Sequence, residues 1–192
     1  MRGGTAGWIA ALLLAALLAA PGAAAATTEV AGERFADRIG ADEAGLDLCS
    51  AHLFRWKRIV KAYVAALYLR DCSVLPERPQ EMPQRLELAY QRGFSAPQFA
   101  EAADTVLERS FPPRVLDPLR ERIARLHAAY RAVETGDRYA LTWRPGVGTE
   151  LALNGEPLVV VPGADFAAAY FAIWLGADPA DKGLRDRLLT PR

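Results

Sequence analysis

The feature that most constrains this chain is the stretch 55–69, an apolar run that opens with a cluster of cations. From residue 59 onward it is rich in Val, Leu and Tyr, and Lys61 is its only charged residue. Such a run is typical of a strand covered on both faces, so we expect the rest of the fold to be built around it. Arg55, Lys57 and Arg58 at its start have two interpretations. They are either a solvated hairpin turn or a cationic mouth that holds an anion at the edge of an apolar cavity, because a guanidinium presents donors matched to a carboxylate.

The N-terminus has the three parts of a secretory signal peptide. A charged start with Arg2 is followed by the uncharged run 8–20, by a Pro-Gly pair and by four consecutive alanines. That order is typical of a signal peptide with a small-residue cleavage site, and the uncharged run is shorter than the roughly 20 residues of a membrane span. We therefore predict a cleavable signal peptide at residues 1–26 and one domain at residues 27–192. The protein is expected to be periplasmic or secreted, with no membrane span after cleavage.

Charge and motifs exclude several classes of function. The chain has 23 basic and 23 acidic side chains, so no basic excess indicates a nucleic-acid partner. No nucleophile motif, phosphate-binding loop or dinucleotide motif is present, and His52 and His127 are the only histidines. Both are expected to be surface or packing residues rather than ligands. We therefore expect no cofactor and no metal site.

An oxidising compartment would allow the two cysteines, Cys49 and Cys72, to form a disulfide. The expected strand geometry disfavours this bond. If residues 55–58 form the turn of a hairpin, the residue opposite Cys49 is near Ala65. Cys72 would then lie about seven residues, or roughly 23 Å, further along the strand. A disulfide needs Cα atoms within about 7 Å of each other, so a bridge is expected only if the two strands are not hairpin partners.

The pattern of turns and helix signals predicts an α+β fold. A first strand is expected at residues 28–35, and a helix begins after Ser95, with Gln98 in the reciprocal capping position. A second helix is expected at residues 117–136, and Asn154-Gly155 predicts a tight antiparallel hairpin. Because the helices are segregated from the antiparallel strands, the fold is expected to be α+β rather than alternating α/β.

Two long motifs resemble the chalcone isomerase-like proteins of bacteria. The first is Arg55-x-Lys57 followed by residues 61–69; the second comprises residues 144–149, the Asn154-Gly155 pair, residues 162–166 and residues 173–176. The resemblance covers nearly the whole chain after residue 26. It implies an open-faced β-sandwich, in which a large antiparallel sheet is covered by a layer of helices with a ligand cleft between them.

The resemblance also implies candidate site residues. The family's cleft arginine falls on Arg55, and the threonine that its enzymes carry on the central strand falls on Tyr63. The enzymes' tyrosine and asparagine fall on Phe99 and Val106, and their late Ser or Thr falls near Ile173. Phe99 and Val106 lack the polar groups of the enzymes' tyrosine and asparagine, and orienting donors of this kind are each worth about two to three powers of ten in rate. We therefore predict these five as ligand-binding residues and none as catalytic.

The family contains both plant enzymes that close a chalcone to a flavanone and relatives that bind fatty acids, so fold alone does not decide the function. We favour a non-catalytic, exported binder of a small anionic amphiphile such as a fatty acid. Two alternatives stay open: an isomerase or intramolecular lyase acting on an unknown substrate, and a scaffold or assembly protein whose cleft is filled by its own side chains.

Overall fold

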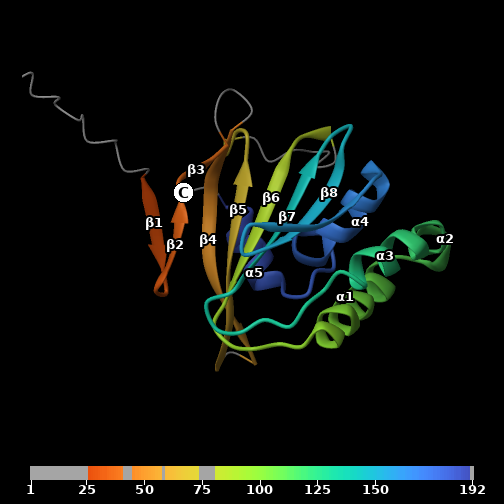
Figure 1. The fold of residues 1–192 in the computed structure, drawn as a ribbon, viewed down its shortest axis with the longest axis horizontal. Coiled ribbons are helices and arrows are strands. Elements are labelled where there is room, and N and C mark those ends of the chain that lie inside the picture. The colour runs from red at the N-terminus through yellow and green to blue at the C-terminus, as the bar shows by residue number, and fades with distance from the viewer. Residues whose placement is uncertain (1–25, 41–44, 58, 74–80, 191–192) are drawn as a thin grey trace, which may run out of the picture.

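A computed structural model describes residues 26–40, 45–57, 59–73 and 81–190. The fold is α+β: a curled antiparallel sheet of seven strands carries helices on one face (Figure 1). The strands lie side by side in the order of the sequence, so the sheet is a simple meander. They are β3 (Arg38–Ile39), β4 (Leu46–Trp56), β5 (Val60–Leu69), β6 (Gln84–Tyr90), β7 (Arg138–Arg144), β8 (Gly148–Leu153) and β9 (Glu156–Val161).

The helices follow β6 and β9 and pack on one face of the sheet, as an open-faced β-sandwich requires (Figure 1). The α1 helix begins after Ser95 as predicted, and the Ser95 amide donates to Gln98 Oε1 at 2.8 Å. The helical segments are α1 (Ala96–Ser110), α2 (Pro113–Leu116), the 3-10 turn η3 (Asp117–Leu119), α3 (Arg120–His127), α4 (Ala164–Leu175) and α5 (Lys182–Leu188).

The other face of the sheet is covered by a small hairpin, β1 (Thr27–Val30) and β2 (Glu33–Ala36). The single strand predicted at residues 28–35 was wrong, because Ala31 and Gly32 both have positive φ, at 53° and 88°, and turn the chain back on itself. Phe35 of β2 is buried in a second apolar cluster on this face.

The apolar run forms the central strand β5, and both of its faces are covered as predicted. Ala65, Leu67 and Leu69 belong to the core beneath the helices, whereas Val64 and Tyr68 belong to the core beneath the β1–β2 hairpin. Alternate residues of a strand point to opposite faces, so this one strand joins the two cores.

An ion-pair network lies beneath the β1–β2 hairpin. Arg138 of β7 contacts Glu87 of β6 at 2.9 Å and Glu33 of β2 at 2.8 Å. The second oxygen of Glu87 contacts Arg85 at 2.8 Å, and the Arg138 guanidinium lies 4.7 Å from the centre of the Phe35 ring. Because Glu87 is mostly buried, its charge needs both arginines.

The predicted hairpin is confirmed, whereas the predicted end of the second helix is wrong. Asn154 and Gly155 have φ of 51° and 83° and join β8 to β9, which confirms the hairpin. The helix predicted to continue to residue 136 instead ends at His127. The chain beyond it is extended because Val133 exchanges both backbone hydrogen bonds with Phe94, at 2.9 and 3.0 Å.

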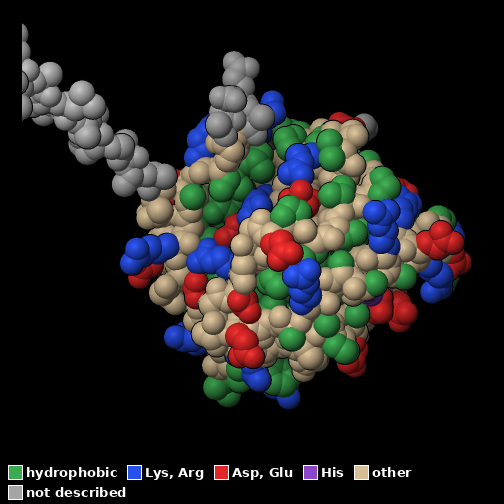
Figure 2. All heavy atoms as spheres, viewed as in Figure 1, with side chains coloured by type: hydrophobic (Ala, Val, Ile, Leu, Met, Phe, Trp, Pro, Cys, Tyr) green, Lys and Arg blue, Asp and Glu red, His purple; other side chains and the backbone are tan. Residues whose placement is uncertain are grey.

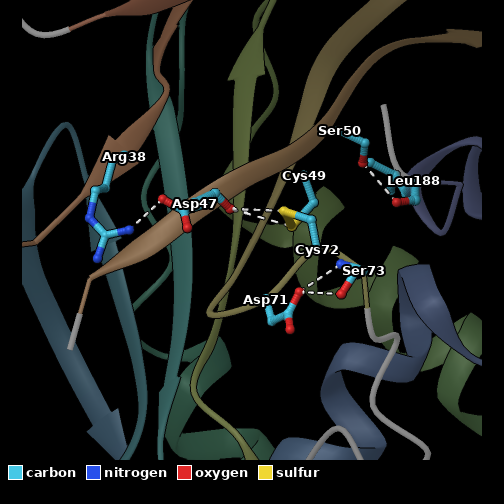
Figure 3. Close-up of a disulfide and its surroundings, with 8 residues drawn as sticks. All are labelled: Arg38, Asp47, Cys49, Ser50, Asp71, Cys72, Ser73 and Leu188. Atoms are coloured by element: carbon cyan, nitrogen blue, oxygen red, sulfur yellow. Dashed lines mark hydrogen bonds and ion pairs between the residues drawn. A yellow bond between two sulfur atoms is a disulfide. The ribbon is translucent and has the colours of Figure 1, made fainter. Parts of the chain in front are cut away.

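The expectation that disfavoured a disulfide was wrong, because Cys49 and Cys72 are bonded and their Cα atoms lie 5.1 Å apart (Figure 3). The turn lies at residues 57–59 rather than 55–58, and Cys49 is an extra residue between the pairs Leu48–Tyr68 and Ser50–Leu67. Cys49 therefore faces a point much closer to the end of β5 than a regular hairpin predicts.

The chain then turns at Asp71, whose Oδ1 accepts hydrogen bonds from the Ser73 amide at 2.8 Å and the Ser73 hydroxyl at 2.7 Å (Figure 3). This turn brings Cys72 back to β4. Within the described ranges, no helix has both the length and the apolarity needed to cross a bilayer. The predicted signal peptide lies almost wholly outside the described residues.

Candidate functional site

A cavity of about 540 Å³ lies between the sheet and the helices α1 and α4. This volume is within the roughly 300–1,000 Å³ of small-molecule sites. Its lining comes from strands β4 to β8, from the segment after β6, and from the helical layer. The lining residues are Phe54, Trp56, Ala62, Tyr63, Leu86, Leu88, Tyr90, Arg92, Phe94, Gln98, Phe99, Ala102, Ala103, Val106, Tyr130, Tyr139, Leu141, Leu151, Tyr170, Ile173, Trp174 and Ala180.

The sheet contributes one wall through simple alternation. Leu86, Leu88 and Tyr90 are every second residue of β6, and Tyr139 and Leu141 hold the same position on β7. The register pairs Leu88 with Tyr139 and Leu86 with Leu141, so these side chains form a continuous apolar surface.

The helices contribute the facing wall. Phe99, Ala103 and Val106 recur on α1 at spacings of four and three, which places them on one helical face. On α4, Ile173 and Trp174 follow Tyr170 by three and four residues and share one face in the same way. The Phe99 ring is central to this wall. Its centre lies 5.3–5.4 Å from those of Tyr90, Tyr130 and Tyr139, distances typical of favourable aromatic pairs.

Five tyrosines line the cavity, and their hydroxyls are polar groups within its mainly apolar walls. The Tyr130 and Tyr170 hydroxyls bond to each other at 2.7 Å. The Tyr139 hydroxyl donates to the Arg131 carbonyl at 2.9 Å and accepts from the Arg131 amide at 2.7 Å. Most of these hydroxyls are therefore already engaged within the protein.

The remaining two hydroxyls, those of Tyr63 and Tyr90, differ in their partners. Tyr63 bonds to the Trp174 indole, whereas no hydrogen bond within the described residues reaches the Tyr90 hydroxyl, although Tyr90 is only 3% exposed. Tyr90 thus offers a free donor inside an apolar cavity. A polar ligand atom there would give the Tyr90 hydroxyl a hydrogen-bond partner that none of the described residues supplies.

Burial keeps these phenols protonated. Desolvation is the largest cause that raises the pKa of Tyr63, Tyr90, Tyr130, Tyr139 and Tyr170. At neutral pH they can donate or accept hydrogen bonds, but they cannot serve as phenolate bases. The described residues that line the cavity include no Asp, Glu, His, Lys or Cys.

The cavity opens where lining residues are exposed to solvent, and we call this its mouth: Trp56, Arg92, Gln98, Ala102 and Ala180. Arg92 is the one cation among the described lining residues, and its guanidinium lies 5.5 Å from the centre of the Phe94 ring. A guanidinium beside an aromatic face is suited to an anion at the edge of an apolar space.

The structure brings together four of the five predicted ligand-binding residues. Tyr63, Phe99, Val106 and Ile173 all line the cavity. Arg55 does not, and it is exposed to solvent. It lies between Phe54 and Trp56, which both line the cavity, so the alternation of β4 places its side chain on the opposite face of the sheet.

The sequence argument identified Tyr63 but missed the two other tyrosines of the sheet, Tyr90 and Tyr139, and the arginine at the mouth. Both tyrosines lie in short runs of the sequence, 86–90 and 139–143, in which large apolar residues alternate with polar or small ones, and this alternation was a signal that could have identified them. Arg92 carried no such signal. It lies in the connection between β6 and α1, and its position at the mouth depends on how that connection crosses the end of the sheet.

Comparison with known proteins agrees with this geometry. No curated protein matches the chain. Among solved structures, the fatty-acid binding protein AtFAP1 of Arabidopsis thaliana is similar, with a TM-score of 0.63 and 17% sequence identity over 85% of this chain and 96% of that one. At this identity the likeness establishes the fold and not the ligand. The sequence model described as chalcone isomerase-like matches residues 26–190, so the chain belongs to the chalcone isomerase-like family.

Proposed function

We propose that this protein is an exported, non-catalytic binder of an anionic amphiphile such as a fatty acid. The observation that carries the proposal is the cavity of about 540 Å³, whose walls are apolar and aromatic and whose one cation among the described lining residues, Arg92, lies at the mouth. The fold shared with a fatty-acid binding protein of Arabidopsis thaliana supports the same ligand class. Export is supported by the signal-peptide pattern and by the Cys49–Cys72 disulfide, since such bonds persist in oxidising compartments.

The proposed ligand lies with its tail inside the cavity and its carboxylate at Arg92. Each buried methylene contributes about 0.8 kcal/mol, so a tail of ten methylenes contributes about 8 kcal/mol before the costs of association. An exposed ion pair contributes at most about 1 kcal/mol. The tail therefore supplies the affinity, and the guanidinium supplies the orientation.

Neither alternative function is favoured by a specific observation. A scaffold with a closed cleft would fill the space beneath α1 and α4, whereas an open cavity lies there. Catalysis by a general base is most efficient when the pKa of that base lies near the working pH. The described lining offers only phenols whose pKa is raised by burial, together with Arg92.

Native mass spectrometry and a titration test the proposal. The purified protein is expected to carry an acyl chain, and a fluorescent fatty acid is expected to bind it with saturable stoichiometry. Ala103→Trp, which fills the cavity from α1, should abolish binding, and Val106→Phe should weaken it as a smaller change. Circular dichroism checks that both variants fold.

A matched pair of arginine variants tests the role of the mouth. Arg92→Ala should weaken fatty-acid binding about fivefold, whereas Arg55→Ala, on the face away from the cavity, should leave it unchanged. A loss of binding in Arg55→Ala alone would instead favour the assignment made from the family resemblance. An empty protein that binds no fatty acid in either assay would overturn the proposed function.

A further inference from the structure

The tip of the β4–β5 hairpin exposes two large apolar side chains. Trp56 ends β4 and is 52% exposed, and Ile59 lies in the turn before β5 and is 81% exposed. In Figure 2, hydrophobic and basic side chains gather at the lower edge of the molecule, where this hairpin ends in Figure 1. Large apolar side chains exposed together mark interaction sites.

Three cations among the described residues flank this apolar pair. The Lys57 ammonium lies 4.5 Å from the centre of the Trp56 ring. Arg55 and Lys61 are cross-strand partners, and both are exposed. Like charges directly opposite each other on neighbouring strands are destabilising, so an anionic partner would relieve a repulsion that the folded protein carries. We call Arg55, Trp56, Lys57, Ile59 and Lys61 the tip patch.

The tip patch adjoins the mouth of the cavity. Trp56 belongs to both, and the chain after β6 reaches the start of β5 through the hydrogen bond from the Gln91 amide to the Ala62 carbonyl at 2.9 Å. Arg92 follows Gln91 directly and adds a fourth cation on this side of the molecule. Whatever binds the tip patch therefore lies next to the opening of the cavity.

We propose that the tip patch docks on an anionic lipid bilayer. Trp56 and Ile59 would enter the boundary between headgroups and acyl chains, where an indole is favoured because its body is apolar and its N–H is polar. Arg55, Lys57 and Lys61 would lie against anionic headgroups, each strengthening binding about fivefold. The cavity mouth would then face the membrane surface, which is where an amphiphile would enter or leave.

The size of the patch favours a bilayer over a protein partner. A stable protein interface needs about 800 Å², or roughly 20–30 residues, on each partner, whereas the tip patch as defined above has five residues. A bilayer accepts a small apolar tip ringed by cations without a complementary surface. Docking itself does not require the proposed ligand; only the role of the docked state in lipid exchange rests on the proposed function.

Vesicle flotation tests the docking. Residues 26–192 contain every described element of the fold and both apolar cores, so this chain is used without the uncharged N-terminal run. It is expected to float with vesicles of mixed phosphatidylglycerol and phosphatidylcholine and to stay in solution with pure phosphatidylcholine. Added salt should weaken binding, because it screens exposed charges.

Two double variants separate the apolar and the basic contributions. Lys57→Glu with Lys61→Glu should lower the partition coefficient at least about 25-fold, and Trp56→Ser with Ile59→Ser should lower it at least about tenfold. The matched control is Val115→Ser with Val147→Ser, which removes two apolar side chains exposed elsewhere, at 38% and 58%, and should change nothing.

The proposal would be overturned if the wild type did not float with anionic vesicles, if the tip variants floated equally well, or if the control variant lost binding equally. A dimer that disappears in the tip variants, with no vesicle binding, would assign the patch to a protein interface and would also overturn it. Lys57 and Lys61 do not line the cavity, so their variant should bind soluble fatty acid normally. Failure of docking is thereby distinguished from failure of ligand binding.

Discussion

Reduction of the Cys49–Cys72 disulfide is expected to destabilise the protein substantially without changing its fold. The bond joins the ends of the β4–β5 hairpin region across 23 residues of chain. In the folded state these residues are already held by the strand pairing. In the unfolded state the strand pairing is lost and the bond alone keeps the two cysteines close, so most of its effect is on the entropy of the unfolded chain.

The magnitude follows from the length of the closed loop. For a separation of 23 residues, the chain-entropy relation gives a stabilisation of about 3.4 kcal/mol at 25 °C. Stability changes of this size shift the thermal midpoint of a chain this long by roughly 7–14 °C. With a urea m-value of about 2 kcal/mol/M, the midpoint of unfolding should move by about 1.7 M.

The measurement compares one sequence in two redox states. Urea unfolding is followed by circular dichroism with and without a strong thiol reductant, so no side-chain volume changes between the two curves. A Cys49→Ala and Cys72→Ala variant supplies the control: it should be insensitive to the reductant and resemble the reduced wild type. Titration of free thiols in the oxidised, denatured protein should find none.

A destabilisation below about 1 kcal/mol would refute the reasoning. It would mean that the unfolded chain keeps the hairpin ends close without the bond, so that no loop entropy is removed. Two free thiols in protein isolated from an oxidising compartment would refute the pairing itself. An equal effect of reductant on the double-alanine variant would show that the change does not come from this disulfide.

Four further outcomes are expected. Glu87→Gln should destabilise the fold by about 3 kcal/mol in urea unfolding, since it leaves two arginines without their shared buried acid; an unchanged midpoint would contradict this. Burial lowers the pKa of His127, so the neutral side chain contributes its full stability above the unfolded value of about 6.5, and this stability is lost as the pH falls below that value; His127→Gln should flatten the dependence of the unfolding free energy on pH, and an unchanged dependence would contradict this. Sequencing of protein from the cell envelope should find an N-terminus between Ala23 and Thr27, whereas a start at Met1 would exclude export with cleavage. In the presence of the protein, the absorbance of a chalcone should decay at its spontaneous rate, because the described lining offers no suitable base, and an acceleration of several powers of ten would contradict this expectation.

The sheet and its position in the fold were predictable because local residues determine them. The run at 59–69 has no polar face, and a strand of this kind must lie at the centre of a covered sheet. Asn154 and Gly155 accept the positive φ that a tight hairpin needs, so their turn follows from the dipeptide alone. Ser95 and Gln98 similarly mark the start of α1.

The disulfide was not predictable by counting residues along a regular hairpin. One extra residue at Cys49 shifts the register, a turn at residues 57–59 moves the point of reversal, and Asp71 bends the chain back after β5. A second irregularity adds one residue on β5, because Phe54 pairs with Tyr63 whereas Arg55 pairs with Lys61. The later turn, this added residue and the bend at Asp71 together bring two Cα atoms that a regular hairpin separates by roughly 23 Å to 5.1 Å.

The family resemblance and the local sequence pattern make different predictions about which arginine borders the cavity. The resemblance directed attention to Arg55, yet Phe54 and Trp56 on either side of it are the apolar residues of that segment. In a strand with alternating faces, an arginine between two aromatic neighbours points away from the surface that they cover. The structure follows the local pattern: the aromatic pair lines the cavity, and Arg55 is exposed on the other face. Arg92, two residues beyond the alternating β6 set, is the cation at the mouth.

Arg55 and Arg92 therefore have separable roles in the proposals above, since Arg92 borders the ligand space and Arg55 belongs to the tip patch. Arg92→Ala should weaken the binding of soluble fatty acid, and Arg55→Ala should weaken only the binding of anionic vesicles.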